Sequence, residues 1–112
     1  MITSADVILR SDKTQVLDAL FTLAHDECVY YSNYEVATGT TDGAISLGPV
    51  TTATVVYVKS DQTVTVKHNA SATAITITAN GFILLFNTSV TALTVTNASG
   101  STANMKIYFA GN

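Results

Sequence analysis

The 112-residue sequence contains one cysteine and one proline, and only 12% of its residues are charged. A single cysteine, Cys28, cannot form an intrachain disulfide, which excludes a small scaffold stapled by disulfide bonds. The charged fraction is about half the ~25% of an ordinary soluble domain. Eight acidic against five basic residues give a net charge of −3. This balance argues against a protein that binds nucleic acid through its phosphates.

Long hydrophobic runs and targeting segments are also missing. The longest unbroken apolar run, residues 82–86, has five residues, far fewer than the ~20 that cross a bilayer. The first residues lack a basic start followed by a long apolar core, so we expect no secretory signal peptide. We therefore expect a protein that is made and folded in a cytosol and does not enter a membrane.

Threonine and serine take the place of the missing charges. The chain has 19 Thr and 9 Ser, a quarter of its residues, and 47% of the residues are apolar. This apolar fraction is enough to bury a core against the loss of backbone entropy, so the chain is not disordered. Its length fits a single domain over residues 1–112.

From residue 44 onward the sequence has the pattern of short β-strands, with turn residues roughly every eight to twelve positions. Valine and threonine alternate over residues 62–68, and alternation with a period of two is typical of a strand with one buried face. The pattern recurs over 74–78, 90–96 and 104–110, while 51–59 is β-branched and aromatic. We predict an all-β fold, a compact antiparallel β-sandwich of the jelly-roll kind with threonine on its outward positions.

Two turn signals predict tight hairpins between neighbouring strands. Ser60-Asp61 lies between the runs over 51–59 and 62–68, and Asn80-Gly81 follows the run over 74–78. Asn-Gly is the strongest short signal for a type I′ turn, because both central residues of that turn need positive φ. The run that follows, residues 82–86, is apolar on both sides. It is either a central strand covered on both faces or a strand whose outer face meets a partner.

The first third of the chain is acidic. Residues 1–42 hold seven acidic and two basic residues, a net charge of −5, whereas residues 43–112 carry a net charge of +2. Exposed charges are screened beyond ~8 Å at physiological salt, so the favoured interpretation is a solvated acidic face. The alternative is a head-to-tail contact between copies.

The secondary structure of this first third is ambiguous. Residues 12–15 resemble a helix-capping box and the apolar residues that follow share one helical face, so a short helix near residues 13–25 is possible. The same residues also fit a strand. Residues 28–34 favour a strand by propensity, and residues 1–10 could form an extended arm that reaches a neighbour.

Four potential metal ligands are adjacent at residues 25–28, in the order His25, Asp26, Glu27 and Cys28. On a strand they alternate between two faces and cannot converge, and a further ligand such as His68 has to come from elsewhere. A nucleophilic Cys28 needs an activating base, and the chain has only two histidines. We predict no catalytic residue, no metal and no cofactor, and we predict that the protein is not an enzyme.

Tyr30, Tyr31 and Tyr34 form the one aromatic cluster of the sequence. Tyrosine is enriched at protein interfaces and also stacks on sugars, but one or two of these rings can equally pack into the core. Together with Phe82 and Phe86 from the apolar run, they are the candidate interface residues.

Three stretches of the chain carry a resemblance to a known class of proteins. They are Gly39-Thr-Thr-Asp-Gly-Ala-Ile-Ser-Leu-Gly48, Val56-Tyr-Val-Lys-Ser-Asp61, and Ala-Ile-Thr-Ile-Thr-Ala-Asn-Gly81 with the strands after it. Over roughly residues 38–111 the chain resembles small virion proteins of tailed bacteriophages. The resemblance implies a compact β-sandwich that decorates or cements the capsid, or that belongs to the neck or tail.

Sequence and resemblance together predict a non-enzymatic virion structural protein that decorates or cements the capsid surface. The expected partners are further copies of the chain and a major capsid, neck or tail protein, with no nucleic acid and no membrane. The protein is expected to be made in the host cytoplasm and located in the virion. The alternatives are a neck or tail accessory protein and a module that binds a host glycan.

Overall fold

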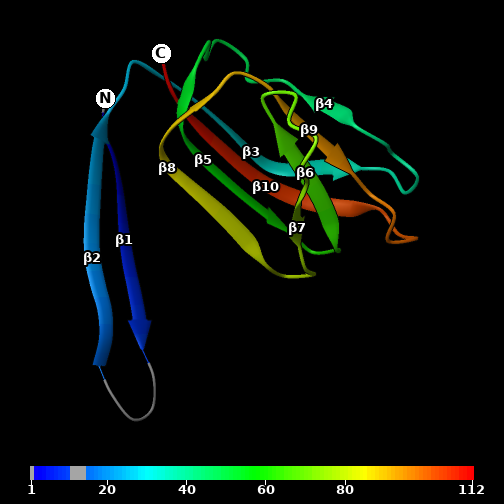
Figure 1. Cartoon of the computed structure of the whole chain (residues 1–112), viewed down its shortest axis with the longest axis horizontal. Coiled ribbons are helices and arrows are strands. Elements are labelled where there is room, and N and C mark those ends of the chain that lie inside the picture. Colours follow the sequence, from blue (N-terminus) through cyan, green and yellow to red (C-terminus); the bar gives the residue numbers. More distant parts are fainter. Residues whose placement is uncertain (1, 11–14) are drawn as a thin grey trace.

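The computed structural model describes residues 2–10 and 15–112, and within these residues it contains ten β-strands and no helix (Figure 1). Two strands form an N-terminal hairpin, β1 (Ile2–Arg10) and β2 (Gln15–Ala24). The other eight strands are β3 (Glu27–Val36), β4 (Gly43–Ile45), β5 (Ala53–Ser60), β6 (Val64–His68), β7 (Ile75–Ile77), β8 (Phe82–Val90), β9 (Leu93–Thr96) and β10 (Ala103–Gly111). The prediction of an all-β fold is confirmed.

The eight strands form two four-stranded antiparallel sheets that pack face to face. The first sheet has the order β3-β10-β5-β8 and the second the order β4-β9-β6-β7. The pairs are nested: β3 pairs with β10, β4 with β9, β5 with β8, and β6 with β7. Residues 27–111 thus form one long double strand that is rolled over two sheets, which is the jelly-roll arrangement.

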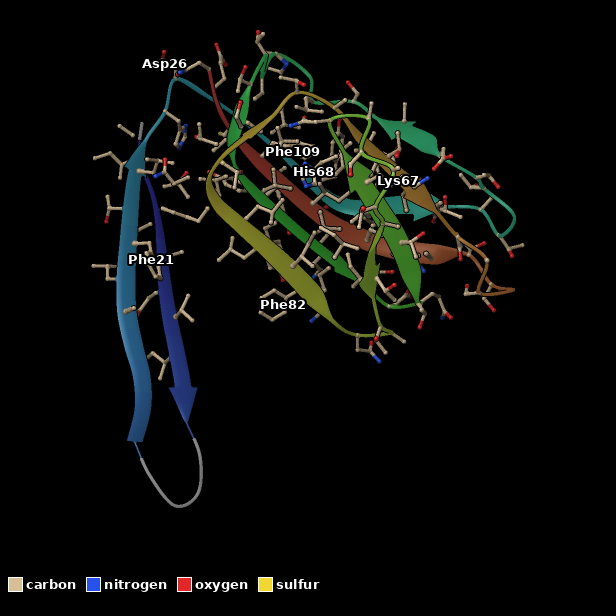
Figure 2. All side chains as sticks on the ribbon, viewed as in Figure 1. Phe21, Asp26, Lys67, His68, Phe82 and Phe109 are labelled. Atoms are coloured by element: carbon tan, nitrogen blue, oxygen red, sulfur yellow. The ribbon has the colours of Figure 1, made fainter. Side chains whose placement is uncertain are left out.

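The core lies between the two sheets and consists of alternate residues of their strands. Strand β10 contributes Met105, Ile107 and Phe109, all fully buried, because it is paired on both sides and lies in the interior of its sheet. Figure 2 shows Phe109 inside the sandwich. Gly111 ends this strand, and a side-chain carbon added there would lie 1.9 Å from the carbonyl oxygen of Thr52. Only glycine therefore fits where β10 meets the start of β5.

Both predicted tight hairpins are wrong. Strands β5 and β6 lie in different sheets, as do β7 and β8, so the turns at Ser60-Asp61 and Asn80-Gly81 carry the chain from one sheet to the other. Asn80 has a positive φ of 67° but Gly81 does not, so the turn is not of type I′. The two crossings are joined by backbone hydrogen bonds. The Asn80 backbone N–H donates to the Ser60 carbonyl (2.8 Å), and the Ser60 backbone N–H donates to the Gly81 carbonyl (3.2 Å).

Two of the open alternatives in the sequence are decided by the strand order. The possible helix near residues 13–25 is wrong for residues 15–24, which form strand β2. Residues 12–14 of the capping box predicted at 12–15 lie outside the described residues. A central strand at 82–86 is also wrong, because β8 is an edge strand of the first sheet. Residues 2–10 form strand β1 and pair with β2.

The buried Asn97 fastens three segments at one end of the sandwich. Its side-chain amide donates to the carbonyls of Val36 (2.9 Å) and Ser101 (2.8 Å), and its Oδ1 accepts from the Ser99 amide (3.1 Å) and hydroxyl (2.7 Å). Its own exposure is zero, and its bond to the Val36 carbonyl is fully buried. A buried polar group that loses its partner costs its full desolvation energy.

We expect Asn97→Ala to lower the free energy of unfolding by about 2 kcal/mol or more, because it leaves the Val36 carbonyl without its partner. Urea denaturation followed by circular dichroism measures the change. Asn33→Ala, at an exposed position of β3, is the matched control and should change stability by less than about 0.5 kcal/mol. Equal losses in the two variants would contradict this role for Asn97.

Asp61, in the crossing from β5 to β6, anchors the beginning of β10. Its carboxylate accepts hydrogen bonds from the Asn104 backbone amide (2.8 Å) and from the Asn104 side-chain amide (3.1 Å). These bonds favour the charged form, so they lower the pKa of Asp61 below its ordinary value of 3.8. The resulting stability is fully present above that ordinary value and is lost as the pH falls through the lower pKa of the folded state.

We therefore expect Asp61→Asn to make stability less dependent on pH below about pH 4, because the variant has no carboxylate to protonate. Unfolding free energies of the wild type and the variant are compared in urea at neutral pH and at several acidic pH values. Glu35→Gln, which removes one negative charge from an exposed position on β3, is the control. A wild-type acid dependence that Asp61→Asn leaves intact would refute the assignment.

Candidate interaction surface

The outer face of the first sheet is apolar and aromatic. One cross-strand row runs through all four strands, in the order Tyr30, Tyr108, Tyr57 and Leu84. Its other apolar members are Val55, Phe82 and Phe86, and Lys59 and Lys106 lie at the Phe82 end of the same face. None of the seven apolar and aromatic residues belongs to the core between the sheets. We call them the aromatic face.

The outer face of the second sheet is chemically different. Its outward positions carry threonines that lie opposite one another, Thr65 facing Thr76 on one side and Thr96 on the other. Lys67 lies beside them and forms an ion pair with Asp42, with 3.4 Å between Nζ and Oδ1. The prediction that threonine occupies outward strand positions therefore holds for the second sheet but not for the first.

The β1–β2 hairpin, which we call the arm, projects away from the sandwich and diverges from β8 (Figure 1). The chain leaves the arm at His25 and Asp26, and the Asp26 amide donates to the Gly111 carbonyl (3.0 Å), which fixes the start of β3 against β10. Alternate residues divide the described part of the arm into two sides. Thr3, Ala5 and Val7 are half-buried on one side, while the residues between them are exposed.

Two contacts hold the base of the arm to the aromatic face. The Thr3 hydroxyl oxygen lies 2.5 Å from His25 Nε2 and 2.8 Å from the Tyr108 hydroxyl oxygen, so it links the two groups in either histidine tautomer. The Phe21 ring lies 5.7 Å from the Phe86 ring, centroid to centroid. His25 is 95% buried and its Nδ1 has no hydrogen-bond partner in the described part of the chain.

An open groove of about 520 Å³ lies between the base of the arm and the aromatic face. Its walls are the first residues of β1, from Ile2 to Ala5, and five residues of the sheet, which are Tyr30, Val55, Tyr57, Leu84 and Tyr108. Three tyrosines from three strands thus share one groove.

The exposed large hydrophobic side chains gather on the arm and the aromatic face. Within the described residues there are six, and each lies on one of these two surfaces: Ile2, Ile8, Leu20 and Phe21 on the arm, and Tyr30 and Phe82 on the sheet. Leu20 is 69% and Phe82 61% exposed. Figure 2 shows Phe21 on the arm and Phe82 on the outside of the sandwich. Large exposed apolar groups that cluster mark sites of interaction.

The five predicted interface residues are divided between two places. Tyr30, Phe82 and Phe86 belong to the aromatic face, whereas Tyr31 and Tyr34 turn to the other side of β3 and pack against the core. The last two rings contact each other edge to face at 5.3 Å, and their hydroxyls donate to the carbonyls of Ser46 and Ala44. A register shift in the β3–β10 pairing brings Tyr31 and Tyr34 to the same side, although they are three residues apart.

The cluster at residues 25–28 does not converge. His25 points to Thr3, while Asp26, Glu27 and Cys28 are exposed on the turn and the start of β3. Within residues 2–10 and 15–112, no group of three or more His, Cys, Asp or Glu side chains is placed to hold a metal ion. The second histidine, His68, lies at the end of β6 in the other sheet.

The sequence suggested an arm at residues 1–10, but it did not predict the pairing of this segment with β2 or four of the seven residues of the aromatic face. Tyr57 and Tyr108 sit within alternating runs, where the side facing outward is visible but its sheet is not. The pattern of the first third fits both a helix and a strand, so it does not predict that Ile8 and Leu20 lie exposed on a hairpin. The sequence feature that indicates an exposed apolar face is the run over residues 82–86, which is apolar on both sides and predicts a partner as one alternative.

Comparison with known proteins identifies no relative. No family model, no curated protein and no solved structure matches the chain. The part of the chain that the structure describes includes no helix long and apolar enough to cross a membrane.

We expect Thr3→Val to loosen the base of the arm, because the hydroxyl that joins His25 to Tyr108 is lost while the shape of the side chain is kept. Hydrogen exchange of the β1 and β2 amides should become about ten-fold faster, and exchange in β5 and β10 should not change. Thr22→Val, on the exposed side of the arm, is the control. Unchanged exchange in the arm of Thr3→Val would rule out the anchoring role of Thr3.

Proposed function

We propose that this chain is a non-enzymatic structural protein of a tailed-bacteriophage virion, where it decorates or cements the surface of the capsid. The observation that carries the proposal is the concentration of exposed large hydrophobic residues on the arm and the aromatic face. A protein that works alone in solution rarely exposes such surface together, because it promotes association. In a shell, neighbouring copies and the capsid cover it.

The low charge of the chain supports the same role. A surface with few charges cannot repel identical copies strongly, and 12% charged residues is far below the fraction that favours a monomeric, highly soluble domain. Repeated weak contacts on a lattice add up through avidity. A domain of this size can therefore hold firmly to a shell without a large interface of its own.

The fold is compatible with this role and adds a modest argument by analogy. Eight-stranded jelly rolls are common in viral capsid proteins, and they also occur in lectins and cupins. A fold does not by itself determine a function, so the proposal rests on the surfaces. The resemblance of residues 38–111 to small phage virion proteins points in the same direction.

The proposal predicts that the protein is a component of purified virions at a copy number that matches a repeating position on the particle. Particles purified by density gradient are labelled with gold-conjugated antibody raised against the chain and are imaged by electron microscopy. Labelling over the whole head supports a capsid role, and labelling confined to the neck or tail supports the accessory alternative. Purified particles that contain none of the protein would overturn both.

A second candidate function, binding of a host glycan, is favoured by one observation. The groove beside the arm collects Tyr30, Tyr57 and Tyr108, and sugar rings stack on the faces of tyrosine rings. If the chain is a glycan-binding module, the purified domain binds specific sugars on a glycan array and Tyr57→Ala abolishes that binding. A cement protein without this activity gives no signal on the array.

A further inference from the structure

The outward side of the arm carries large exposed apolar side chains between polar ones such as Ser4, Asp6 and Thr22. Ile8 and Leu20 are 46% and 69% exposed on this side, and Ile2, 68% exposed, lies at its base beside the groove. The opposite side contacts the aromatic face through Thr3 and Phe21. A two-stranded hairpin is at best marginally stable by itself in water. Covering the outward side with another apolar surface would stabilise the arm.

The aromatic face also has an uncovered end. The arm packs beside Phe86 in the middle of β8, while Phe82 at the start of the strand remains 61% exposed. Lys59 pairs with Phe82 across the strands, and Lys106 pairs with Lys59. Neither lysine has a carboxylate within 4.0 Å among the described residues. Two like charges directly opposite each other are unfavourable, so this end of the face favours an apolar partner that carries a negative charge.

The outward side of the arm has that composition. Asp6 lies opposite Leu20 in the β1–β2 register, and both are exposed. On the aromatic face, Lys59 lies opposite Phe82 in the same way. An apolar residue beside an acid can therefore meet an apolar residue beside a base, which is the complementarity that fixes the register of an interface.

We propose that the arm of one copy of this chain packs on the aromatic face of a second copy, with Leu20 against Phe82 and Asp6 beside Lys59. The contact uses two different surfaces of each copy, so it is heterologous and joins copies head to tail into a ring or an open row. The inference rests on the assembly role proposed above but not on the location of the protein in a virion.

The size of the arm predicts that one such contact is weak. Strand β1 has nine residues, so the hairpin is about 30 Å long and about 10 Å wide, a footprint of roughly 300 Å². A stable interface buries about 800 Å² on each partner. Single contacts therefore exchange in solution, and a closed ring or a lattice makes them lasting.

Cysteine pairs in separate chains test the contact. Cys28 is replaced by serine, and Leu20→Cys and Phe82→Cys are introduced into separate chains, so that a disulfide between the two variants has to join two copies. The variants are mixed in the presence of oxidised glutathione, and the mixed dimer is identified by intact mass. We expect it to form at least several-fold faster than the control mixture of Leu20→Cys with Thr76→Cys, an exposed position on the second sheet.

A mixed dimer that forms no faster than the control would overturn the proposal. A chain that carries both Leu20→Cys and Phe82→Cys tests whether the two residues instead meet within one copy. If it yields only the intrachain disulfide at the mass of the monomer, the arm folds back on its own sheet and the contact between copies is refuted. Circular dichroism confirms that each variant retains the β-sheet signal of the parent.

Charge reversal tests the register independently of cysteine chemistry. In the cross-linking mixture, Asp6→Lys on the arm variant should slow formation of the mixed dimer about three-fold or more, and Lys59→Asp on the face variant should restore it. Without restoration the contact is not the one proposed. Antibody labelling of particles reports the virion role separately, so failure of the cross-link and failure of the proposed function are distinguishable.

Discussion

The structure depends on the pairing of β10 with β3 on one side and β5 on the other. This strand places Met105, Ile107 and Phe109 in the core and Tyr108 on the opposite face. The same nine residues therefore supply the centre of the hydrophobic core and the centre of the tyrosine row outside it. The arm depends on β10 as well, because Thr3 contacts Tyr108 and Asp26 is bonded to Gly111.

The two outer faces of the sandwich both carry few charges, but they differ in the side chains that replace them. On the second sheet, threonines occupy the outward positions with short side chains that water can solvate, and the Lys67–Asp42 ion pair lies beside them. On the first sheet, tyrosine, phenylalanine and leucine take those positions. One face is suited to water and the other to a partner, although the composition of the chain as a whole gives no hint of the division.

Alternation along the sequence predicted the strands well, because a period of two is a local property that survives in the fold, as in β6, β7, β9 and β10. It could not predict which strands pair. The Asn80-Gly81 pair predicts a local backbone conformation, and Asn80 does adopt a positive φ. Whether the turn keeps the chain in one sheet or carries it to the other depends on how the strands pack around the core. For that reason the structure has crossings between the two sheets where the sequence predicts hairpins.

The nested pairing also has a consequence for the order of folding. The outermost pair joins β3 to β10, so residues near 30 must meet residues near 108, and the loop between them has to close before the contact is made. A nascent chain that has emerged only as far as residue 102 has β3 and β5 but lacks the strand that lies between them. The first sheet can therefore close only after β10 has been made, and until then β5 also lacks its partner on one side and presents an open edge to other chains.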